Sequence, residues 1–315
     1  MSSPYDRSRL RTVHLVPLTA FDSQGKLNLD VQAQHIDRMR RAGIRVYMPA
    51  AGTSEFHSLS ANEIVLLVQV TRQAAGPEAQ IFAPVGLQLD HAIDVGRRSL
   101  EAGATGVMFM PFSHPYLCNV GVADYYRTVI DALRCPTLIY KKSPIPSDQL
   151  LLEMADNPHV VGIKYAENNL HDFRKVVLAD GDRIEWLCGS AERFAPYYLL
   201  AGSTGYTTGA GNICPHLTLA MHAAFSAGAY AEGMRYQQQI LPIEDYRARE
   251  QDSFNISMLK HAMKRLGFDF GLPRAPQRRL SALDEVAIDE LTDRVLTVER
   301  ELEREAVRVG LVPAA

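Results

Sequence analysis

A lysine and a tyrosine end two consecutive strand-like runs of this sequence. The run Val160–Lys164 is apolar until its last residue, and Pro136–Tyr140 ends in a phenol 24 residues earlier. Burial disfavours an ammonium ion and lowers its pKa, which makes the neutral, nucleophilic amine accessible. An amine and a phenol at one edge of a sheet are the groups that carbonyl chemistry through a Schiff base requires. The alternative is that Lys164 only extends into solvent from a strand end, as most lysines do.

Strand-like and helix-like segments alternate along the first two thirds of the sequence. Eight apolar runs predict strands buried on both faces: Thr12–Pro17, Ile44–Pro49, Ile81–Val85, Thr105–Met110, Pro136–Tyr140, Val160–Lys164, Ile184–Cys188 and Gly205–Thr208. Seven intervening segments have helical periodicity: Asp30–Ala42, Ala61–Ala75, Asp90–Ala102, Val122–Leu133, Ser147–Ala155, Leu170–Ala179 and Ala191–Ala201. This order predicts an α/β fold, a (βα)8 TIM barrel. A doubly wound open sheet is the alternative, weakened because no GxGxxG follows the first strand.

Helices alone are expected after the eighth strand. The predicted segments are Pro215–Ala227, Tyr230–Glu250, Phe254–Leu266 and Ala282–Val307. The first would complete the barrel, so residues 1–227 are expected to form the (βα)8 barrel. Residues 228–315 are expected to form a C-terminal helical extension. Three glycines (Gly43, Gly103 and Gly202) stand where a helix should end before a strand, which is typical of a left-handed helix cap.

Composition restricts the class of protein more than its activity. The 315 residues are 47% hydrophobic and carry a formal net charge of -3, which gives no electrostatic reason to expect nucleic acid or an anionic membrane as partner. The four cysteines have no CxxC spacing, and no HxH or HExxH motif predicts a metal. We expect no metal and no cofactor. Without a signal-peptide pattern or a membrane-length apolar run, a cytoplasmic location is the expectation.

The ends of the predicted strands carry the other candidate residues, because catalytic side chains of a TIM barrel lie there. The segments that follow the strands are Gly52-Thr53-Ser54-Glu55, Lys141-Lys142, Gly189-Ser190-Ala191-Glu192 and Thr207-Thr208-Gly209. Lys141 and Lys142 either contact an acidic or phosphorylated substrate or are solvated loop charges. The loop Gly209–Asn212 has the composition of a phosphate cradle.

Four ordered motifs resemble those of one known family. They are the segment 51–60 with Gly52-Thr53-Ser54-Glu55, the strand Cys135–Tyr140, the strand Val161–Lys164 and the stretch Ala201–Gly209. The chain resembles, from about Val13 to Leu280, the dihydrodipicolinate synthase/N-acetylneuraminate lyase group of class I aldolases. Those proteins are (βα)8 barrels that bind 2-oxo acids as Schiff bases.

The resemblance implies a role for each matched residue. Lys164 would form the imine, and Tyr140 would transfer protons. Thr53 and Ser54 would hold the substrate carboxylate, although the same turn is compatible with a helix cap. The other expected substrate-binding residues are Gly52, Gly189, Glu192 and Thr207. Glu192 is equally compatible with a helix cap, and Glu55 is expected to tie the loop down rather than react.

Three departures from the family pattern bear on the reaction. Synthases of the family have a hydroxyl residue at Gly52, a neighbouring subunit's tyrosine near Ser113 and an arginine at Ile145. We therefore predict a Schiff-base-forming lyase acting on a 2-oxo acid, by pyruvate-dependent aldol cleavage or condensation or by dehydration of a 2-keto-3-deoxy sugar acid. The alternatives are a dihydrodipicolinate synthase with altered relay residues and a non-catalytic 2-oxo-acid-binding relative. The family resemblance also implies a homo-oligomer, a tetramer or a dimer.

Overall fold

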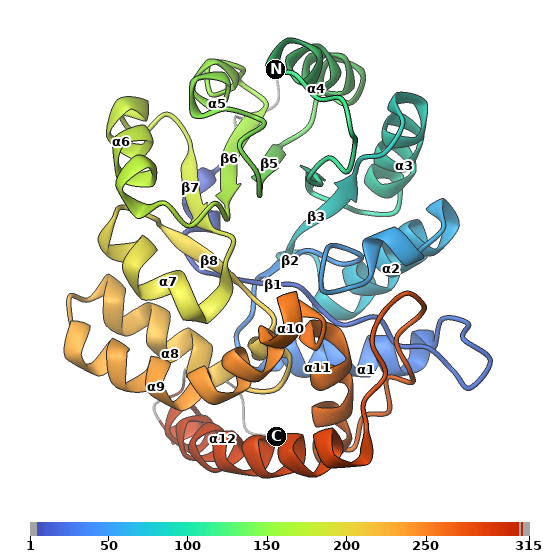
Figure 1. Cartoon of the computed structure of the whole chain (residues 1–315), viewed down its shortest axis with the longest axis vertical. Helices are drawn as coiled ribbons and strands as arrows, with labels where there is room; N and C mark the ends of the chain where they lie inside the picture. The colour runs from blue at the N-terminus through green and yellow to red at the C-terminus, as the bar shows by residue number, and fades with distance from the viewer. Residues whose placement is uncertain (1–4, 309, 311–315) are drawn as a thin grey trace.

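Eight parallel strands close into a barrel in the computed structural model, which describes residues 5–308 and 310 (Figure 1). Each strand pairs with the next along the chain, and β8 pairs with β1. The strands are β1 (Val13–Leu15), β2 (Val46–Tyr47), β3 (Gln80–Val85), β4 (Gly106–Phe109), β5 (Thr137–Lys141), β6 (Val160–Tyr165), β7 (Glu185–Cys188) and β8 (Gly205–Thr208). The predicted TIM barrel is confirmed, and the closed sheet rules out the doubly wound alternative.

A ring of helices surrounds the strands (Figure 1). They are α1 (Leu29–Arg41), α2 (Ala61–Ala75), α3 (Leu89–Glu101), α4 (Asn119–Leu133), α5 (Asp148–Met154), α6 (Leu170–Asp180), α7 (Ala191–Leu200) and α8 (Pro215–Ser226). Short 3-10 turns are η1 (Arg7–Leu10), η2 (Phe56–Ser58), η3 (Ala210–Asn212) and η4 (Lys264–Leu266). Local sequence signals determine where several helices begin or end. Ser60 and Glu63 form a capping box at the start of α2. Gly43, Gly103 and Gly202 have φ of 102°, 100° and 108°, the left-handed caps expected from the sequence.

Alternate strand residues separate into two apolar layers. Leu138 and Tyr140 belong to the cluster inside the barrel, whereas Ile139 between them packs in the layer below the helices. The register between β5 and β6 shifts between Thr137 and Leu138, after which Tyr140 lies opposite Lys164. The shift therefore sets which β6 residues face the interior.

The chain after α8 adds four helical segments, α9 (Tyr230–Arg247), α10 (Arg249–Asp252), α11 (Asn255–Met263) and α12 (Ala282–Arg308). The expected helix Tyr230–Glu250 is three residues too long, because Glu250 and Gln251 adopt left-handed φ of 47° and 60°. The division into a barrel and an extension at residue 227 stays a prediction. Residues 309 and 311–315 of the predicted extension lie outside the described part. Within residues 5–308 and 310, we find no helix with the length and apolarity that crossing a membrane requires.

Substitution of Gly106 tests the close approach of β4 to β5. A Cβ at this position would collide with the carbonyl oxygen of Pro136, which accepts a hydrogen bond from Val107 N. Gly106→Ala should lower the free energy of unfolding by about 1–3 kcal/mol, measured by urea denaturation. Gly121→Ala in α4 is the matched control, because its Cβ would meet only the Cys118 Sγ at 3.6 Å. Equal effects of the two substitutions would contradict this account of the barrel.

Candidate active site

Lys164 and Tyr140 meet inside the barrel. They are register partners on β6 and β5, and the Lys164 Nζ lies 3.9 Å from the centroid of the Tyr140 ring. Their side chains are almost fully buried, with relative exposures of 4% and 9%. The alternative that Lys164 extends into solvent is therefore wrong. The structure brings together the two residues that the strand ends singled out.

Burial shifts the pKa of both Lys164 and Tyr140. Desolvation is the main cause that lowers the pKa of Lys164 to about 7, and the positive charge of Lys142 acts in the same direction. About half of the amine is then unprotonated at neutral pH. Desolvation raises the pKa of Tyr140, and the charges of Cys188 and Asp252 raise it further. The phenol therefore keeps its proton at neutral pH, so the pair combines a nucleophile with a proton donor.

Gly189 leaves room for the lysine side chain, and Gly162 allows β6 to lie close to β7. A Cβ at Gly189, after β7, would lie 3.0 Å from the Lys164 Cγ and 2.9 Å from the Ala166 Cβ. A Cβ at Gly162 would lie 2.7 Å from the carbonyl oxygen of Glu185. Gly189, expected to bind substrate, thus adjoins the reactive side chain, where its lack of a side chain gives Lys164 space.

The turn Ala51–Glu55, called the β2 turn below, follows β2. Ser54 is fully buried and its hydroxyl donates to the carbonyl of Pro17, while its carbonyl accepts from Thr19 Oγ1 at 2.7 Å. The expected contact between the Ser54 hydroxyl and substrate does not fit this placement, because that hydroxyl braces the turn. Thr53 is half-buried and Gly52 is exposed. Within the described residues, the N–H groups of Gly52 and Thr53 donate to no other group.

Glu192 and Thr207 occupy different environments at the ends of β7 and β8. Thr207 pairs in register with His14 and is 3% exposed. Glu192 is fully buried, and its carboxylate accepts hydrogen bonds from Thr208 and Thr218 hydroxyls. Burial and the neighbouring charge of Glu244 raise the pKa of Glu192 to about 7. Neither a substrate contact nor a side-chain helix cap fits Glu192; it links α7, β8 and α8.

The two lysines after Tyr140 have separate roles. Lys141 is 2% exposed and its amine lies 2.8 Å from Glu167 and 3.6 Å from Asp148. It is a buried ion-pair residue, which neither of the two sequence-based alternatives anticipated. Lys142 is exposed, and within the described residues it makes no ion pair. The sequence could not separate the two, because the carboxylates that pair with Lys141, those of Glu167 and Asp148, come from other segments of the chain.

His14 is a buried polar residue to which the sequence analysis assigned no role. It is fully buried, and its Nε2–H donates to the Leu10 carbonyl oxygen at 2.7 Å, which leaves Nδ1 without a partner. Desolvation lowers the pKa of His14 to about 4, and the nearby charges of His222 and Lys164 contribute. The imidazole is thus neutral near Lys164. A histidine within the apolar run Val13–Leu15 was the available signal.

Two further features concern phosphate and metal binding. In the Gly209–Asn212 loop, Asn212 is fully buried and its amide donates to the Val16 and Gly209 carbonyls, which does not fit a phosphate cradle. The part of the chain that the structure describes has no cluster of three or more His, Cys, Asp or Glu residues that could hold a metal ion.

Comparisons with known proteins agree with the fold. The Dihydrodipicolinate synthetase family matches residues 9–292. A relative called "Probable 5-dehydro-4-deoxyglucarate dehydratase" from Bacillus subtilis (strain 168) is 29% identical over 260 residues, covering 80% of this chain and 83% of its own. Dihydrodipicolinate synthase structures from Bacillus clausii and Oceanobacillus iheyensis have TM-scores of 0.88 and 0.88 with identities of 34% and 29%. They cover 91% and 93% of this chain and 98% and 100% of theirs.

The protein is therefore a class I lyase of the aldolase and dehydratase type, which acts on a 2-oxo acid through a Schiff base. The chain belongs to the Dihydrodipicolinate synthetase family. Membership confirms the resemblance drawn from the four motifs.

The lowered pKa of Lys164 predicts the pH dependence of imine formation. Cyanoborohydride in the presence of pyruvate should label Lys164. Below pH 7 the labelling rate should rise about tenfold for each unit by which the pH increases, and it should level off near pH 8. The unprotonated amine is the nucleophile, so the rate follows its population. Peptide mass mapping measures the label, and Lys164→Met is the unlabelled control. A rate that climbs steadily to pH 10 would show an ordinary lysine pKa.

Proposed function

We propose that this protein dehydrates a 2-keto-3-deoxy sugar acid with a carboxylate at each end, of the kind represented by 5-dehydro-4-deoxyglucarate. The observation that carries the proposal is the buried contact of the Lys164 amine with Tyr140 at 3.9 Å. The curated relatives support the dehydratase, since several that are 27–29% identical to this chain have that name.

Each step of the proposed reaction uses this pair. The neutral amine of Lys164 attacks the ketone carbon, and loss of water gives a protonated imine. The imine draws electrons from the adjacent deoxy carbon, whose proton passes to the Tyr140 oxygen, deprotonated when Tyr140 protonated the water lost on imine formation. The hydroxyl on the next carbon then leaves as water after accepting a proton from the phenol of Tyr140, whose raised pKa keeps that proton available. Hydrolysis of the imine releases the product and restores the amine.

The β2 turn is the proposed site for the carboxylate next to the ketone. The main-chain N–H groups of Gly52 and Thr53 and the Thr53 hydroxyl are the unused donors there. Successive main-chain N–H groups in a turn bind anions without a cationic side chain. A Cβ at Gly52 would meet no atom within 4 Å, so this side of the turn has space for a ligand. Thr207 and Gly189 are proposed to line the site.

Lys142 is the proposed partner of the second carboxylate. It is the first residue after β5, two residues beyond Tyr140. Its charge helps to lower the pKa of Lys164, which supports a position close to the reactive amine. Ile145, the residue at the position where family synthases have an arginine, packs against the apolar core. An exposed lysine is then the cation available for a dicarboxylate.

Dihydrodipicolinate synthase is the second candidate function. The Bacillus clausii structure with that name is 34% identical to this chain, a higher identity than that of the curated dehydratase relatives. The replacements at Gly52 and Ile145 argue against it, because they remove the hydroxyl and the guanidinium that the family resemblance assigns to synthesis.

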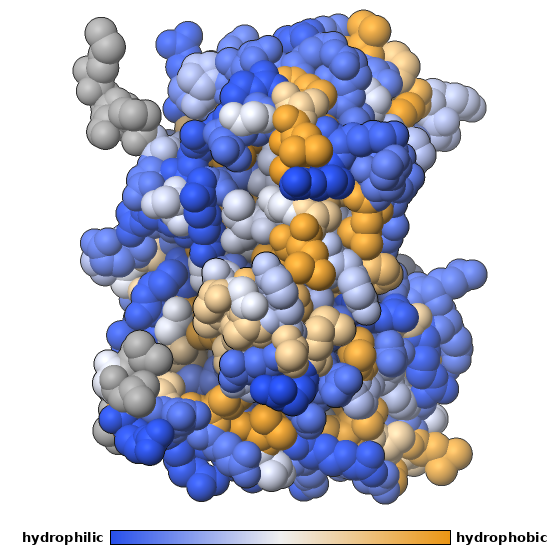
Figure 2. Space-filling model, turned by 90° about the vertical axis from the view of Figure 1, so that its left-hand side faces the viewer, coloured by the Kyte–Doolittle hydropathy of each residue, from blue (hydrophilic) through white to orange (hydrophobic). Residues whose placement is uncertain are grey.

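The remaining proposals concern assembly and location. We propose a cytoplasmic homo-oligomer with a small 2-oxo acid as substrate. Apolar side chains exposed on α6 and α7, Leu178 and Leu200, support association between copies. Figure 2 shows apolar residues scattered among polar ones on one side of the molecule. The four free cysteines, three of them buried, are consistent with a reducing compartment.

Turnover of the two candidate substrates tests the proposed function. Incubation with 5-dehydro-4-deoxyglucarate should give a product that has lost water, detected by mass spectrometry. Pyruvate with aspartate semialdehyde should give no condensation product at the same enzyme concentration. Lys164→Met should abolish turnover. Condensation without dehydration would replace the proposed reaction with that of a synthase.

Lys142→Met tests the partner of the second carboxylate. The KM for the dicarboxylate should rise about tenfold, since a hydrogen bond to a charged group contributes roughly 1.5–3 kcal/mol. Trapping of pyruvate at pH 9 should not change, because pyruvate has a single carboxylate and the Lys164 amine is already neutral. Lys142→Arg should keep the KM low, and Lys175→Met on α6 is the control for the loss of an exposed charge. An unchanged KM in Lys142→Met would remove Lys142 from the site.

A further inference from the structure

Glu55, the last residue of the β2 turn, points into the protein toward the C-terminal extension. Its carboxylate is fully buried; one oxygen lies 2.7 Å from the Lys260 Nζ on α11, and the other accepts a hydrogen bond from the Arg274 N–H at 2.8 Å. Lys260 is itself 2% exposed. Two residues more than 200 positions away in sequence thus hold the end of the turn.

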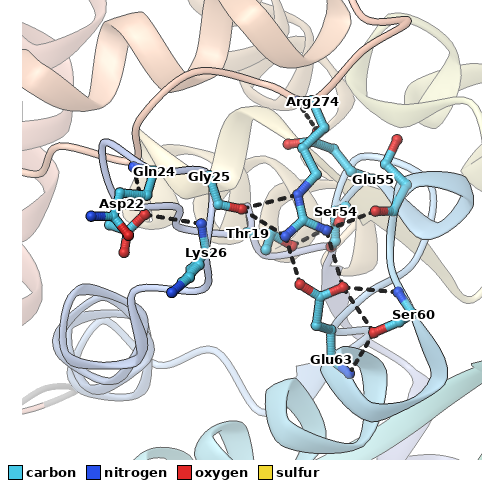
Figure 3. A network of polar contacts seen from close by, with 11 residues as sticks. Thr19, Asp22, Gln24, Gly25, Lys26, Ser54, Glu55, Ser60, Glu63 and Arg274 are labelled. Atoms are coloured by element: carbon cyan, nitrogen blue, oxygen red, sulfur yellow. Dashed lines mark hydrogen bonds and ion pairs between the residues drawn. The ribbon is translucent and has the colours of Figure 1, made fainter.

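The same two residues also hold the chain after β1. The Phe21 ring lies between two cations, 4.2 Å from the Lys260 Nζ and 4.2 Å from the Arg274 Cζ. The guanidinium of Arg274 donates to the Gly25 carbonyl at 2.7 Å and to Glu63 at 2.6 Å. Figure 3 shows Arg274 between the segment around Gly25 and the segment Ser54–Glu63. One residue of the extension therefore joins two loops at the barrel mouth.

The backbone of Glu55 depends on these contacts. Its φ is 69°, in the left-handed region that L side chains rarely adopt. A non-glycine residue stays in such a conformation only where its surroundings fix it. The buried carboxylate supplies that constraint, because moving it would separate two charges that have no access to water.

We infer that Lys260 and Arg274 are positioning residues for the reaction, which hold the β2 turn in the conformation that presents Thr53 and its neighbouring N–H groups to substrate. The inference rests on the proposal that this turn binds the carboxylate next to the ketone. Lys260 does not itself act on substrate, since its amine is buried in the contact with Glu55. The C-terminal extension then takes part in substrate binding without touching the substrate.

Steady-state kinetics of Lys260→Met test the inference. The KM for the 2-oxo acid should rise about tenfold or more, because small misplacements of binding groups are costly. The kcat at saturating substrate should stay within about threefold, since Lys164 and Tyr140 lie on strands the substitution does not touch. Lys260→Arg should restore the KM. Arg265→Met is the matched control: it removes a cation of the extension whose partner, Asp293, is exposed.

Hydrogen exchange distinguishes the positioning of the β2 turn by Lys260 from the binding of the carboxylate by that turn. The amides of the turn that donate hydrogen bonds, those of Ser54, Glu55, Phe56 and Ser58, should exchange faster in Lys260→Met, whereas those of β6 should not change. Unchanged protection of the turn would overturn the positioning role. Faster exchange with an unchanged KM would instead show that the turn does not bind the carboxylate. If Lys260→Met does not fold, Glu55→Gln combined with Lys260→Met removes both charges of the pair, and the same KM rise is expected there.

Discussion

The amine of Lys164 lies over the ring of Tyr140 inside the barrel, and among the described residues no carboxylate accompanies it. A buried amine without a counter-ion is destabilising in its charged form, so the protein favours the neutral form. The barrel provides the conditions for this arrangement. Its parallel strands bring side chains of neighbouring strands together at one end, and apolar residues exclude water below them. The chemistry follows from this one unpaired amine.

Three buried lysines show how strongly the neighbours decide the role of the same side chain. Lys141 meets Glu167 at 2.8 Å and Lys260 meets Glu55 at 2.7 Å, so both join distant segments as ion pairs. Lys164 has an aromatic ring in place of a carboxylate. Lys141 and Lys164 lie near the ends of neighbouring strands, but they differ in the partner that each side chain meets. A lysine in an apolar run is therefore an ambiguous signal until its partners are known.

The sequence was sufficient for the features that depend on local pattern. Strand ends and helix caps are encoded within a few residues, which is why the barrel and the pair of Lys164 and Tyr140 could be predicted. Ser54 and Glu192, both expected to bind substrate, have hydrogen-bond partners that the sequence analysis did not predict. The Ser54 hydroxyl donates to Pro17 and Glu192 accepts from Thr218, and each partner belongs to another βα unit. Nothing near Ser54 or Glu192 in sequence identifies these partners.

The contacts of Glu55 connect the barrel chemistry with the extension. Lys164 and Tyr140 are fixed by strands of the closed sheet, whereas the β2 turn is a loop whose left-handed residue needs support from outside the barrel. Lys260 and Arg274 supply that support from segments that contribute no strand. The pair Lys164 and Tyr140 and the turn proposed to bind the carboxylate are thus held by separate parts of the chain. On this proposal, sequence changes in the extension alter substrate binding while the reactive amine keeps its environment.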